Sequence, residues 1–378
     1  MMSTKMISSK ISCWIAAAGL SLCTLGESAP LDAPLPGDPL EMVTGQIQAA
    51  DTPAARQAAG ELLGRARTNL DLRMGRQGYK LDVTFTVNSG GQTQYDGVWK
   101  MEDTFDPKQG LRWTANTSAG YTITEISSNG QLYAEGTAGD IPLRLHEARA
   151  ALFGSLPSSA GVERAGIRTS TATFHSTGVT CVLLSAPGAA EAPGRRWDET
   201  EECIDPQSGL LMLQSSVPGR YTAYDYSNAP RLNGRIFPRR VTVTEAGKVV
   251  SQISIDSLEQ LPAADPSLFI PTQEMKERGR AIAMGEALKI SRVVATSPAP
   301  TPSGSGAAVV HQVCVFGLVT AAGKLVEAHS LQPSDPYSPA AVEAAQHVNF
   351  ARPALPGELA LPPRQHFAFV IQKFSPTQ

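Results

Sequence analysis

The side chains with the most constrained chemistry are three cysteines that follow residues 1–28, namely Cys181, Cys203 and Cys314. Residues 1–28 have the pattern of an export signal, and in an oxidising compartment two of these thiols can pair. Cys314 lies in an apolar run, where a buried free thiol is the ordinary state. Cys181 begins one predicted strand and Cys203 ends the next, so an antiparallel hairpin places them opposite each other. We predict a Cys181–Cys203 disulfide; the alternative is two small core residues that lie too far apart.

The six histidines occur singly along the chain. Three of them, His311, His329 and His366, fall on predicted strands near the C-terminus and could approach one another as zinc ligands. On alternating strands they can equally lie on a solvated face, and we predict no metal site. Two acidic pairs, Asp198-Glu199 and Glu201-Glu202, could do acid–base chemistry only if they converged in a cleft. We interpret them as an exposed acidic loop.

Familiar catalytic motifs are missing from the sequence. It contains no phosphate-binding Gly-x-x-x-x-Gly-Lys loop, Gly-x-Ser-x-Gly elbow, His-Glu-x-x-His helix or Cys-x-x-Cys pair. With 32 basic and 35 acidic residues, the chain has a formal net charge of −3, which disfavours a nucleic-acid surface. We therefore predict a non-enzymatic protein without a cofactor and without a nucleic-acid partner.

The N-terminus carries the features of a secretory signal. Lys5 and Lys10 precede the apolar run Ile11–Gly26, and Gly26 and Ser28 are small residues at the spacing read by a signal peptidase. We predict cleavage after residue 28 and a periplasmic protein. A retained inner-membrane anchor is the weaker alternative, because the apolar run is shorter than the ~20 residues that span a bilayer. A lipoprotein modified at Cys23 is another, disfavoured by the bulky Leu22 before it.

The last fifth of the chain has a clear element order. The β-branched run Val309–Phe316 and the segment Leu325–Leu331 flank a small-residue turn, which predicts a hairpin. Ser338 is a candidate N-cap for a helix with Pro339 at its first position. Phe367–Phe374 is the final predicted strand, so the order is strand, strand, helix, strand.

About residues 307–375, within a predicted domain at 307–378, resemble the TonB C-terminal domain. The similar segments are Gly323-Lys324-Leu325-Val326 at the turn, Ser338-Pro339-Ala340-Ala341-Val342-Glu343-Ala344 opening the helix and Phe350-Ala351-Arg352-Pro353-Ala354 closing it. The sequence departs from that family where a Tyr-Pro dipeptide is usual before the first strand, and His347-Val348-Asn349 stands where a Trp-Arg pair is usual. The resemblance implies a small sheet packed on one helix and an outer-membrane or periplasmic protein partner.

The start of the mature chain predicts helices, and the centre predicts strands. Leu40, Val43 and Ile47 lie at helical spacing, so residues 29–50 should contain a leader and a first helix. Asp51-Thr52-Pro53 is a typical start for a second helix. From Tyr79 onward, apolar and polar residues alternate in short segments separated by Gly, Pro and Asn turns, with one helical insert at Leu143–Phe153. We predict an α+β protein with a curved antiparallel sheet, or half-barrel, and helices against one opening.

This central region resembles the LolA/LolB lipoprotein-carrier fold over about residues 55–272, within a predicted domain at 51–275. The resemblance rests on the leading helix and on three segments, Asp205-Pro206-Gln207-Ser208-Gly209-Leu210, Phe237-Pro238-Arg239-Arg240 and Asp265-Pro266-Ser267-Leu268-Phe269. It implies an apolar cavity for acyl chains. Phe85, Trp99, Met101 and Trp113 could line that cavity; the alternative is that they are ordinary core residues.

A connecting segment at 276–306 separates the two predicted domains. Thr296–Gly306 consists of Pro, Ser, Thr, Ala and Gly and cannot bury enough apolar surface to fold, so we interpret it as a linker. Ala287–Val294 could be a leading edge strand of the last domain, but its pairing partner does not follow from the sequence.

Three functional hypotheses are consistent with these patterns. The favoured one is a non-catalytic periplasmic binding protein that takes an apolar ligand of lipid or lipoprotein type in the large domain and offers a strand edge of the small domain to an envelope protein. The second is a TonB-type energy-coupling component with a retained N-terminal anchor. The third is an envelope hydrolase whose site is not visible in the sequence.

Overall fold

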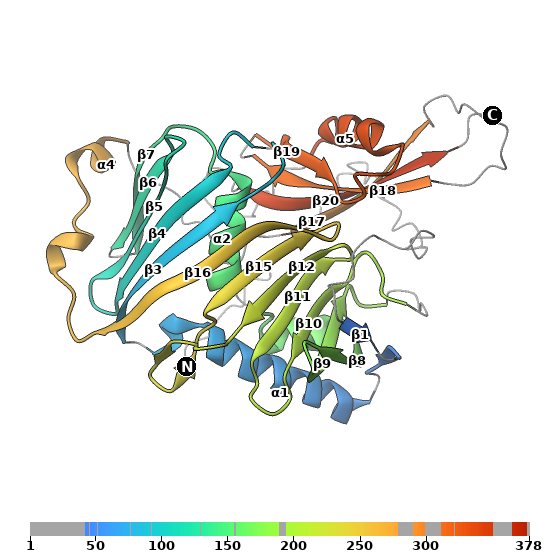
Figure 1. Cartoon of the computed structure of the whole chain (residues 1–378), viewed down its shortest axis with the longest axis horizontal. Helices are drawn as coiled ribbons and strands as arrows, with labels where there is room; N and C mark the ends of the chain where they lie inside the picture. The colour runs from blue at the N-terminus through green and yellow to red at the C-terminus, as the bar shows by residue number, and fades with distance from the viewer. Residues whose placement is uncertain are drawn as a thin grey trace, which may run out of the picture.

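The alternating segments that begin at Tyr79 form one large, curved antiparallel sheet in the computed structural model (Figure 1). The structure describes residues 42–44, 46–50, 52–75, 77–91, 93–128, 130–154, 156–188, 194–278, 290–298, 311–320, 322–350 and 365–375. Within these ranges the large sheet contains 14 strands, and 13 of them follow the order β1-β8-β9-β10-β11-β12-β15-β16-β3-β4-β5-β6-β7, with β2 also paired to β8.

The strands of the large sheet are short and closely spaced along the chain. Their bounds are β1 Met42–Thr44, β2 Gln48–Ala49, β3 Gly78–Val87, β4 Gly97–Asp106, β5 Gly110–Thr117, β6 Thr122–Ser128, β7 Gln131–Gly136, β8 Gly166–Phe174, β9 Thr177–Ser185, β10 Thr200–Ile204, β11 Leu211–Val217, β12 Arg220–Asp225, β15 Arg240–Glu245 and β16 Lys248–Leu261. The long strand β16 pairs with β3 from Ser251↔Val87 to Leu261↔Gly78. This pairing joins the two successive runs of strands into a single sheet.

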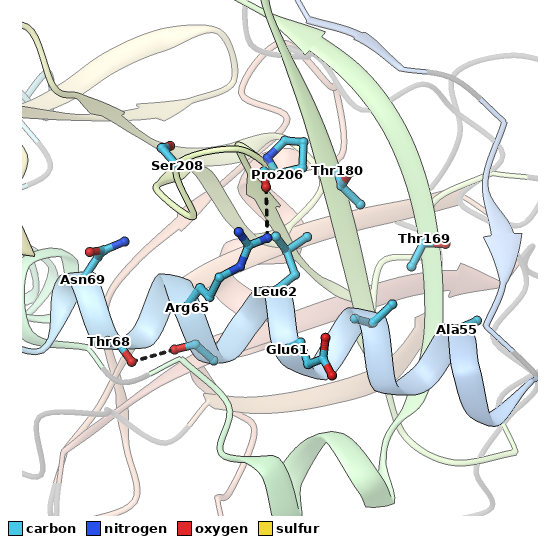
Figure 2. A pocket seen from close by; sticks show the side chains of 13 residues that line it. Ala55, Glu61, Leu62, Arg65, Thr68, Asn69, Thr169, Thr180, Pro206 and Ser208 are labelled. Atoms are coloured by element: carbon cyan, nitrogen blue, oxygen red, sulfur yellow. Dashed lines mark hydrogen bonds between the residues drawn. The ribbon is translucent and has the colours of Figure 1, made fainter.

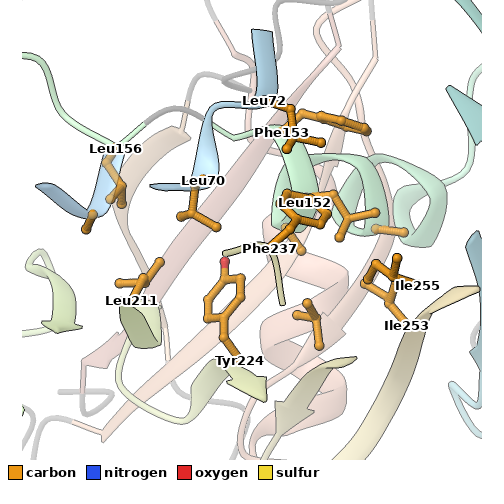
Figure 3. Close-up of a cluster of buried hydrophobic side chains, with 14 of the residues drawn as sticks. Leu70, Leu72, Leu152, Phe153, Leu156, Leu211, Tyr224, Phe237, Ile253 and Ile255 are labelled. Carbon is orange, nitrogen blue, oxygen red and sulfur yellow. The ribbon is translucent and has the colours of Figure 1, made fainter. Parts of the chain in front are cut away.

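Helices cover one face of this sheet. The bounds are α1 Pro53–Leu70, η1 Leu72–Gly75, α2 Leu143–Phe153, α3 Ser159–Arg164, η2 Pro266–Phe269 and α4 Gln273–Arg278, and a separate ribbon pairs β13 Arg231–Leu232 with β14 Arg235–Ile236. Leu70 of α1 and Leu152 of α2 share one hydrophobic core with Phe237 and with the strand residues Ile253 and Ile255 (Figure 3). The predicted curved sheet with helices against one opening is therefore present, and the helical insert has the predicted bounds.

The predicted first helix is wrong. Val43 lies in β1, whose register with β8 runs from Met42↔Phe174 to Thr44↔Ala172, and Ile47 directly precedes β2. Without this segment, β8 would be an edge strand with unpaired backbone N–H and C=O groups. Pairing with these groups stabilises the segment as strands, whereas a short isolated helix is only marginally stable. Leu40 lies outside the described residues.

A second, smaller sheet has the predicted order of elements. It consists of β17 Ile290–Pro298, β18 His311–Val319, β19 Leu325–Ser330 and β20 His366–Ser375, with α5 Ser338–Gln346 between β19 and β20. Their order across the sheet is β17-β20-β18-β19. The leading strand predicted at Ala287–Val294 corresponds to β17. Its partner, which the sequence did not reveal, is β20, with which it pairs in parallel from Ile290↔Phe367. Ser338 is not the N-cap of α5: the helix begins at this residue, after Tyr337.

Both faces of the small sheet are covered. Helix α5 packs Ala341 and Ala345 against Val313 and Val370 on one face. On the other face, Phe316 and Phe369 share an apolar cluster with Leu143, Trp197 and Val217 of the large part. The small sheet is thus packed against the large one.

The first residues of the predicted linker belong to β17, since that strand continues to Pro298, and residues 299–310 lie outside the described ranges.

The described helices contain none that is both long and apolar enough to cross a bilayer. The predicted signal segment at 1–28, including Cys23, lies outside the described residues, so cleavage remains a prediction.

Candidate functional site

Contacts at its N-terminal end hold helix α1 over the β8–β10 part of the large sheet. Thr52 caps the helix by accepting a hydrogen bond from the Ala55 amide at 3.2 Å, with Pro53 in the first turn. Arg56 donates to the carbonyl oxygens of Glu163 at 3.0 Å and Ala165 at 2.9 Å, at the end of α3. The helix is therefore held before any ligand arrives.

The turn between β10 and β11 packs against the C-terminal half of α1. Arg65 donates to the Pro206 carbonyl at 3.0 Å, and Asn69 donates to the Gly209 carbonyl at 3.2 Å. A Cβ atom on Gly209, whose φ is +72°, would lie 3.0 Å from the Cβ atom of Arg65. Only glycine permits so close an approach of helix and turn.

Asp205 shapes this turn from within. Its carboxylate accepts hydrogen bonds from the Gln207 amide at 2.9 Å and from the Ser208 hydroxyl. Burial alone would raise the pKa of Asp205, but these hydrogen bonds and the nearby Arg65 lower it below its ordinary value. The turn therefore presents a fixed negative charge at neutral pH.

An open groove runs between α1 and this turn; we refer to it as the helix groove (Figure 2). Its volume is about 1000 Å³, at the upper end of the roughly 300–1,000 Å³ of ligand sites. Apolar side chains of α1 and polar side chains both contribute to the lining, which consists of Ala55, Ala58, Ala59, Glu61, Leu62, Gly64, Arg65, Thr68, Asn69, Thr169, Thr180, Pro206 and Ser208. Figure 2 shows Leu62 and Ala55 on the helix, across from Thr169 and Thr180 of the strands.

A second groove of about 810 Å³ continues from the first, and we refer to it as the threonine groove. Thr180 and Pro206 line both. Its other lining residues are Thr171, Ala172, Thr173, Ser176, Thr177, Gly178, Val179, Asp205 and Gln207. The lining is richer in hydroxyl groups than that of the helix groove.

The four residues predicted to line a cavity are buried in the hydrophobic core. Phe85, Trp99 and Trp113 are fully buried and Met101 is 3% exposed. They share a cluster with α2 residues such as Leu145, and the ring of Phe85 stacks on that of Trp99 at 5.5 Å. The two large grooves are lined by other residues. The position of the four residues agrees with the alternative that they are ordinary core residues, because α2 packs on the face of the sheet where the cavity was expected.

Helix α2 carries buried charges that local sequence patterns do not reveal. Arg149 pairs with Glu125 at 2.7 Å and lies 4.2 Å over the ring of Trp113. Arg144 binds Glu147 at 2.6 Å on the same helix. A helix with polar residues at regular intervals usually exposes its polar face to solvent. The sequence of α2 has this pattern and therefore does not reveal that α2 is buried on all sides.

Arg144 and Glu147 belong to a charge network between the two sheets, which we name the junction cluster: Arg144, Glu147, Arg220, Glu245 and His329. Arg144 holds both oxygens of Glu245, at 2.8 and 2.9 Å, and Arg220 binds Glu147. His329 of β19 reaches Glu245 at 2.8 Å. Burial would raise the pKa of Glu245, but Arg144 and His329 hold it well below its ordinary value.

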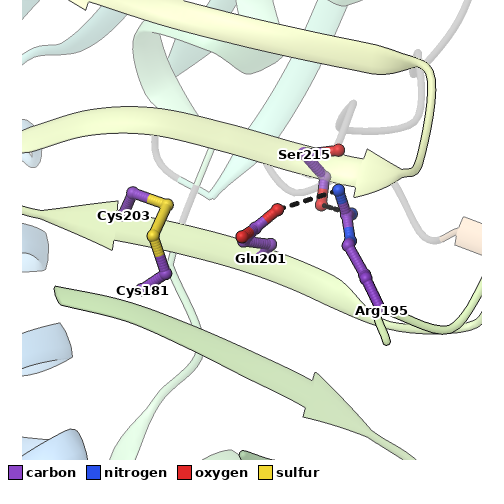
Figure 4. Close-up of a disulfide and its surroundings, with 5 residues drawn as sticks. All are labelled: Cys181, Arg195, Glu201, Cys203 and Ser215. Atoms are coloured by element: carbon purple, nitrogen blue, oxygen red, sulfur yellow. Dashed lines mark hydrogen bonds and ion pairs between the residues drawn. A yellow bond between two sulfur atoms is a disulfide. The ribbon is translucent and has the colours of Figure 1, made fainter. Parts of the chain in front are cut away.

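The predicted disulfide is present. Cys181 and Cys203 face each other across β9 and β10 in the register Cys203↔Cys181, with a Cα separation of 3.9 Å (Figure 4). Glu201 lies beside the disulfide and pairs with Arg195 at 2.9 Å. Cys181, Cys203 and Glu201 are the one group of potential metal ligands that the described residues bring together, and the sulfur–sulfur bond already occupies both thiols. Cys314 is a buried free thiol, as predicted.

The acidic loop prediction is wrong, because Glu199, Glu201 and Glu202 are buried and the half-buried Asp198 pairs with an arginine. Glu199 accepts two hydrogen bonds from Arg168, at 2.7 and 2.6 Å, and Asp198 pairs with Arg196 at 2.9 Å. Glu202 is 2% exposed and accepts a hydrogen bond from Gln214 at 3.1 Å. The arginine partners lie on neighbouring strands and loops, which the acidic pattern alone does not reveal.

The histidines of the small sheet have separate partners. His329 belongs to the junction cluster, whereas His311 pairs with Asp335 at 2.6 Å and stacks on Tyr337. His311 and Asp335 form a base and an orienting group, but hydrolysis also needs a nucleophile. Ser338, a nearby hydroxyl, instead donates to the Gln332 carbonyl and contacts Ser330 at 2.9 Å. No described hydroxyl or thiol forms a hydrogen bond to His311.

Comparison with known proteins adds only distant similarities. No family model and no curated protein matches the sequence. Among solved structures, the chain is similar to a LolA superfamily protein from Nitrosomonas europaea, with 10% identity, coverage of 56% of this chain and 97% of that chain, and a TM-score of 0.36. A putative outer membrane lipoprotein-sorting protein domain from Vibrio parahaemolyticus has 8% identity, coverage of 56% and 95%, and a TM-score of 0.34. A DUF1329 family protein from Desulfovibrio piger has 10% identity, coverage of 57% and 96%, and a TM-score of 0.34.

TM-scores below 0.5 are too low to support conclusions about fold or function. The resemblances of the large domain to LolA and LolB and of residues 307–378 to the TonB C-terminal domain therefore remain predictions. The description of the fold as an open antiparallel sheet with few helices comes from the structure of this chain alone.

Proposed function

We propose that this chain is a non-catalytic binding protein of the cell envelope that holds an apolar chain, of lipid or lipoprotein type, in the helix groove. The observation that carries the proposal is the groove itself: about 1000 Å³ of open space with an apolar stretch along α1 formed by Ala55, Ala58, Ala59 and Leu62. Each methylene group that a ligand buries there contributes about 0.8 kcal/mol to the free energy of binding. Burial of several methylenes is therefore enough for binding, and no catalytic group is needed.

The groove is preformed, which favours a binding role. Arg56 and Arg65 fix α1 to α3 and to the 205–209 turn through carbonyl groups of the large domain. A ligand therefore does not have to order the helix, and less of its interaction free energy is lost on binding. Export to an oxidising compartment is supported by the Cys181–Cys203 disulfide.

The direct test fills the groove. Ala58→Trp places an indole on the lining of the helix groove, whereas Ala54→Trp places one on an exposed part of the same helix outside it. Binding of N-phenyl-1-naphthylamine, an apolar fluorescent probe, is measured by titration. We expect Ala58→Trp to weaken binding at least about tenfold, which corresponds to ~1.4 kcal/mol, and Ala54→Trp to leave it unchanged. Equal binding by both variants would refute the proposal.

We further propose that the small sheet contacts an envelope protein through the edge of β17, by addition of a strand from the partner. Of the two edges, β19 is engaged with the large part through His329. Strand β17 also contacts the large part, since Arg292 donates to the Ser216 carbonyl at 2.7 Å, but it carries Val294 with 43% exposure. A photo-reactive residue at Thr296, also exposed, should cross-link an envelope protein, and Val294→Lys should abolish that product. Val98→Lys, at a 50% exposed site on β4, is the control. A cross-link that survives Val294→Lys would exclude this edge.

A further inference from the structure

The threonine groove differs in chemistry from the helix groove that it continues. Thr171, Thr173, Ser176, Thr177 and Thr180 contribute five hydroxyl groups to its lining. Within the part of the chain that the structure describes, the hydroxyls of Thr171, Thr173 and Thr180 have no hydrogen-bond partner in the protein. A hydroxyl can both donate and accept, so such a lining matches a ligand group that does the same.

The charges of the threonine groove restrict the ligand further. None of its lining residues is Lys or Arg, and its one charged residue is Asp205, a carboxylate already held by Ser208 and the Gln207 amide. Arg65 lies in the adjoining helix groove and donates to the Pro206 carbonyl. A phosphate or carboxylate headgroup would lose its hydration beside Asp205 without a cation to replace it.

The two grooves together have the polarity of a single-chain amphiphile. The apolar lining of Ala55, Ala58 and Leu62 lies on one side of the shared residues Thr180 and Pro206, and the hydroxyl-rich lining lies on the other. Their volumes, about 1000 and 810 Å³, give room for a chain and for a headgroup of substantial size.

We propose that the threonine groove is a headgroup subsite for an uncharged, hydroxyl-rich group, such as the sugar of a glycolipid, whose apolar chain occupies the helix groove. This proposal rests on the function proposed for the helix groove. The threonine hydroxyls exchange hydrogen bonds with the headgroup, and Asp205 disfavours anionic competitors.

Three amphiphiles with one dodecyl chain and different headgroups test this specificity: dodecyl maltoside, dodecanoate and dodecyltrimethylammonium. Each displaces N-phenyl-1-naphthylamine from the full chain below its own critical micelle concentration. We expect the maltoside to bind about tenfold more tightly than dodecanoate, as one or two net hydrogen bonds would give. The ammonium compound reports how much the attraction of Asp205 contributes by itself, because its headgroup is cationic and donates no hydrogen bond. Equal or tighter binding of dodecanoate would overturn the proposal.

The matched variant removes hydroxyls without changing side-chain shape. Thr171 and Thr173 are exposed strand residues, so the double variant Thr171→Val/Thr173→Val should keep its fold, which circular dichroism verifies. It should lose the preference for maltoside while binding dodecanoate as before. An unchanged preference in this variant would also overturn the proposal.

The two proposals fail in distinguishable ways. If Ala58→Trp weakens all three amphiphiles but the headgroups bind equally, the helix groove holds the chain and the headgroup subsite is wrong. If Ala58→Trp weakens none of them, the function proposed for the helix groove is wrong, and the subsite is refuted with it.

Discussion

Glu202 illustrates what one residue reveals only in its three-dimensional context. Beside Glu201 in the sequence it has the pattern of a solvated acid, but the antiparallel pairing of β10 and β11 places it opposite Gln214, in the interior. Among the described residues, its Oε2 atom has no hydrogen-bond partner. Burial raises the pKa of Glu202 to about 8, because the charged form loses its hydration.

Replacing Glu202 by Gln should change the pH dependence of stability. The pKa of the folded state is raised above that of the unfolded chain, so the native state loses stability as the pH rises from about 4.5 to about 8. Glu202→Gln removes this loss, at up to about 1.4 kcal/mol per pKa unit. Urea unfolding at pH 5 and pH 8 should show a variant that is more stable than wild type at pH 8 and similar to it at pH 5. An equal difference at both values would contradict a raised pKa.

At the scale of elements, much of the fold could be predicted, because local patterns determine it. Alternation and turn residues from Tyr79 onward predict the antiparallel sheet, α2 has its predicted bounds Leu143–Phe153, and the β18, β19, α5, β20 order follows from a hairpin signal and a proline-started helix. A helix was predicted within residues 29–50, but residues 42–44 and 48–49 form strands instead. These strands exist only because β8 offers a free edge to pair with. The pairing of β17 with β20 could not be predicted either, because it joins segments more than 70 residues apart.

The contact between α1 and the 205–209 turn gives a prediction at this scale. Gly209→Ala should cost about 1 kcal/mol from its positive φ and about 1–2 kcal/mol more from displacing Arg65, whose Cβ lies 3.0 Å from the new methyl group. The control is Gly247→Ala, since Gly247 has a φ of +75° and no heavy atom lies within 4 Å of the place that its new methyl group would take. Thermal unfolding should show a larger loss for Gly209→Ala. Equal losses would mean that helix and turn separate easily.

At the scale of the whole molecule, the two sheets are joined by charge as well as by apolar contact. Arg220 and Glu245 of the large sheet meet His329 of the small one inside the junction cluster, beside the ring of Phe316. In the sequence alone, His329 is an isolated residue on a predicted strand. Its partner Glu245 lies 84 positions away, so no local pattern could connect them.

Glu245→Gln tests this junction. The substitution leaves Arg144 and His329 buried without a full counter-charge, and breaking a buried pair costs about 3–5 kcal/mol. Since the folded-state pKa of Glu245 is lowered, its contribution is present above about pH 4.5 and is lost as the pH falls further. Glu102→Gln is the control, because Glu102 pairs with Lys80 at the surface and should cost at most ~1 kcal/mol. Similar losses for both in urea unfolding at pH 7 would contradict a stabilising junction.

The grooves lie away from the cavity that the sequence predicts, and the reason is again tertiary. Phe85, Trp99, Met101 and Trp113 are large and apolar, which suits a cavity wall and a core equally, and α2 packs against them. The helix groove is lined by residues as common as Ala58 and Thr180, which acquire a role only because α1 lies across β8 and β9.

The most direct test of the central claim is native mass spectrometry of the full chain purified from its own cell envelope without detergent exchange. We predict a wild-type protein that carries a bound amphiphile, an Ala58→Trp variant that has lost it and an Ala54→Trp variant that retains it. Wild-type protein without any bound amphiphile, or an Ala58→Trp variant with the same load as wild type, would contradict ligand binding in the helix groove.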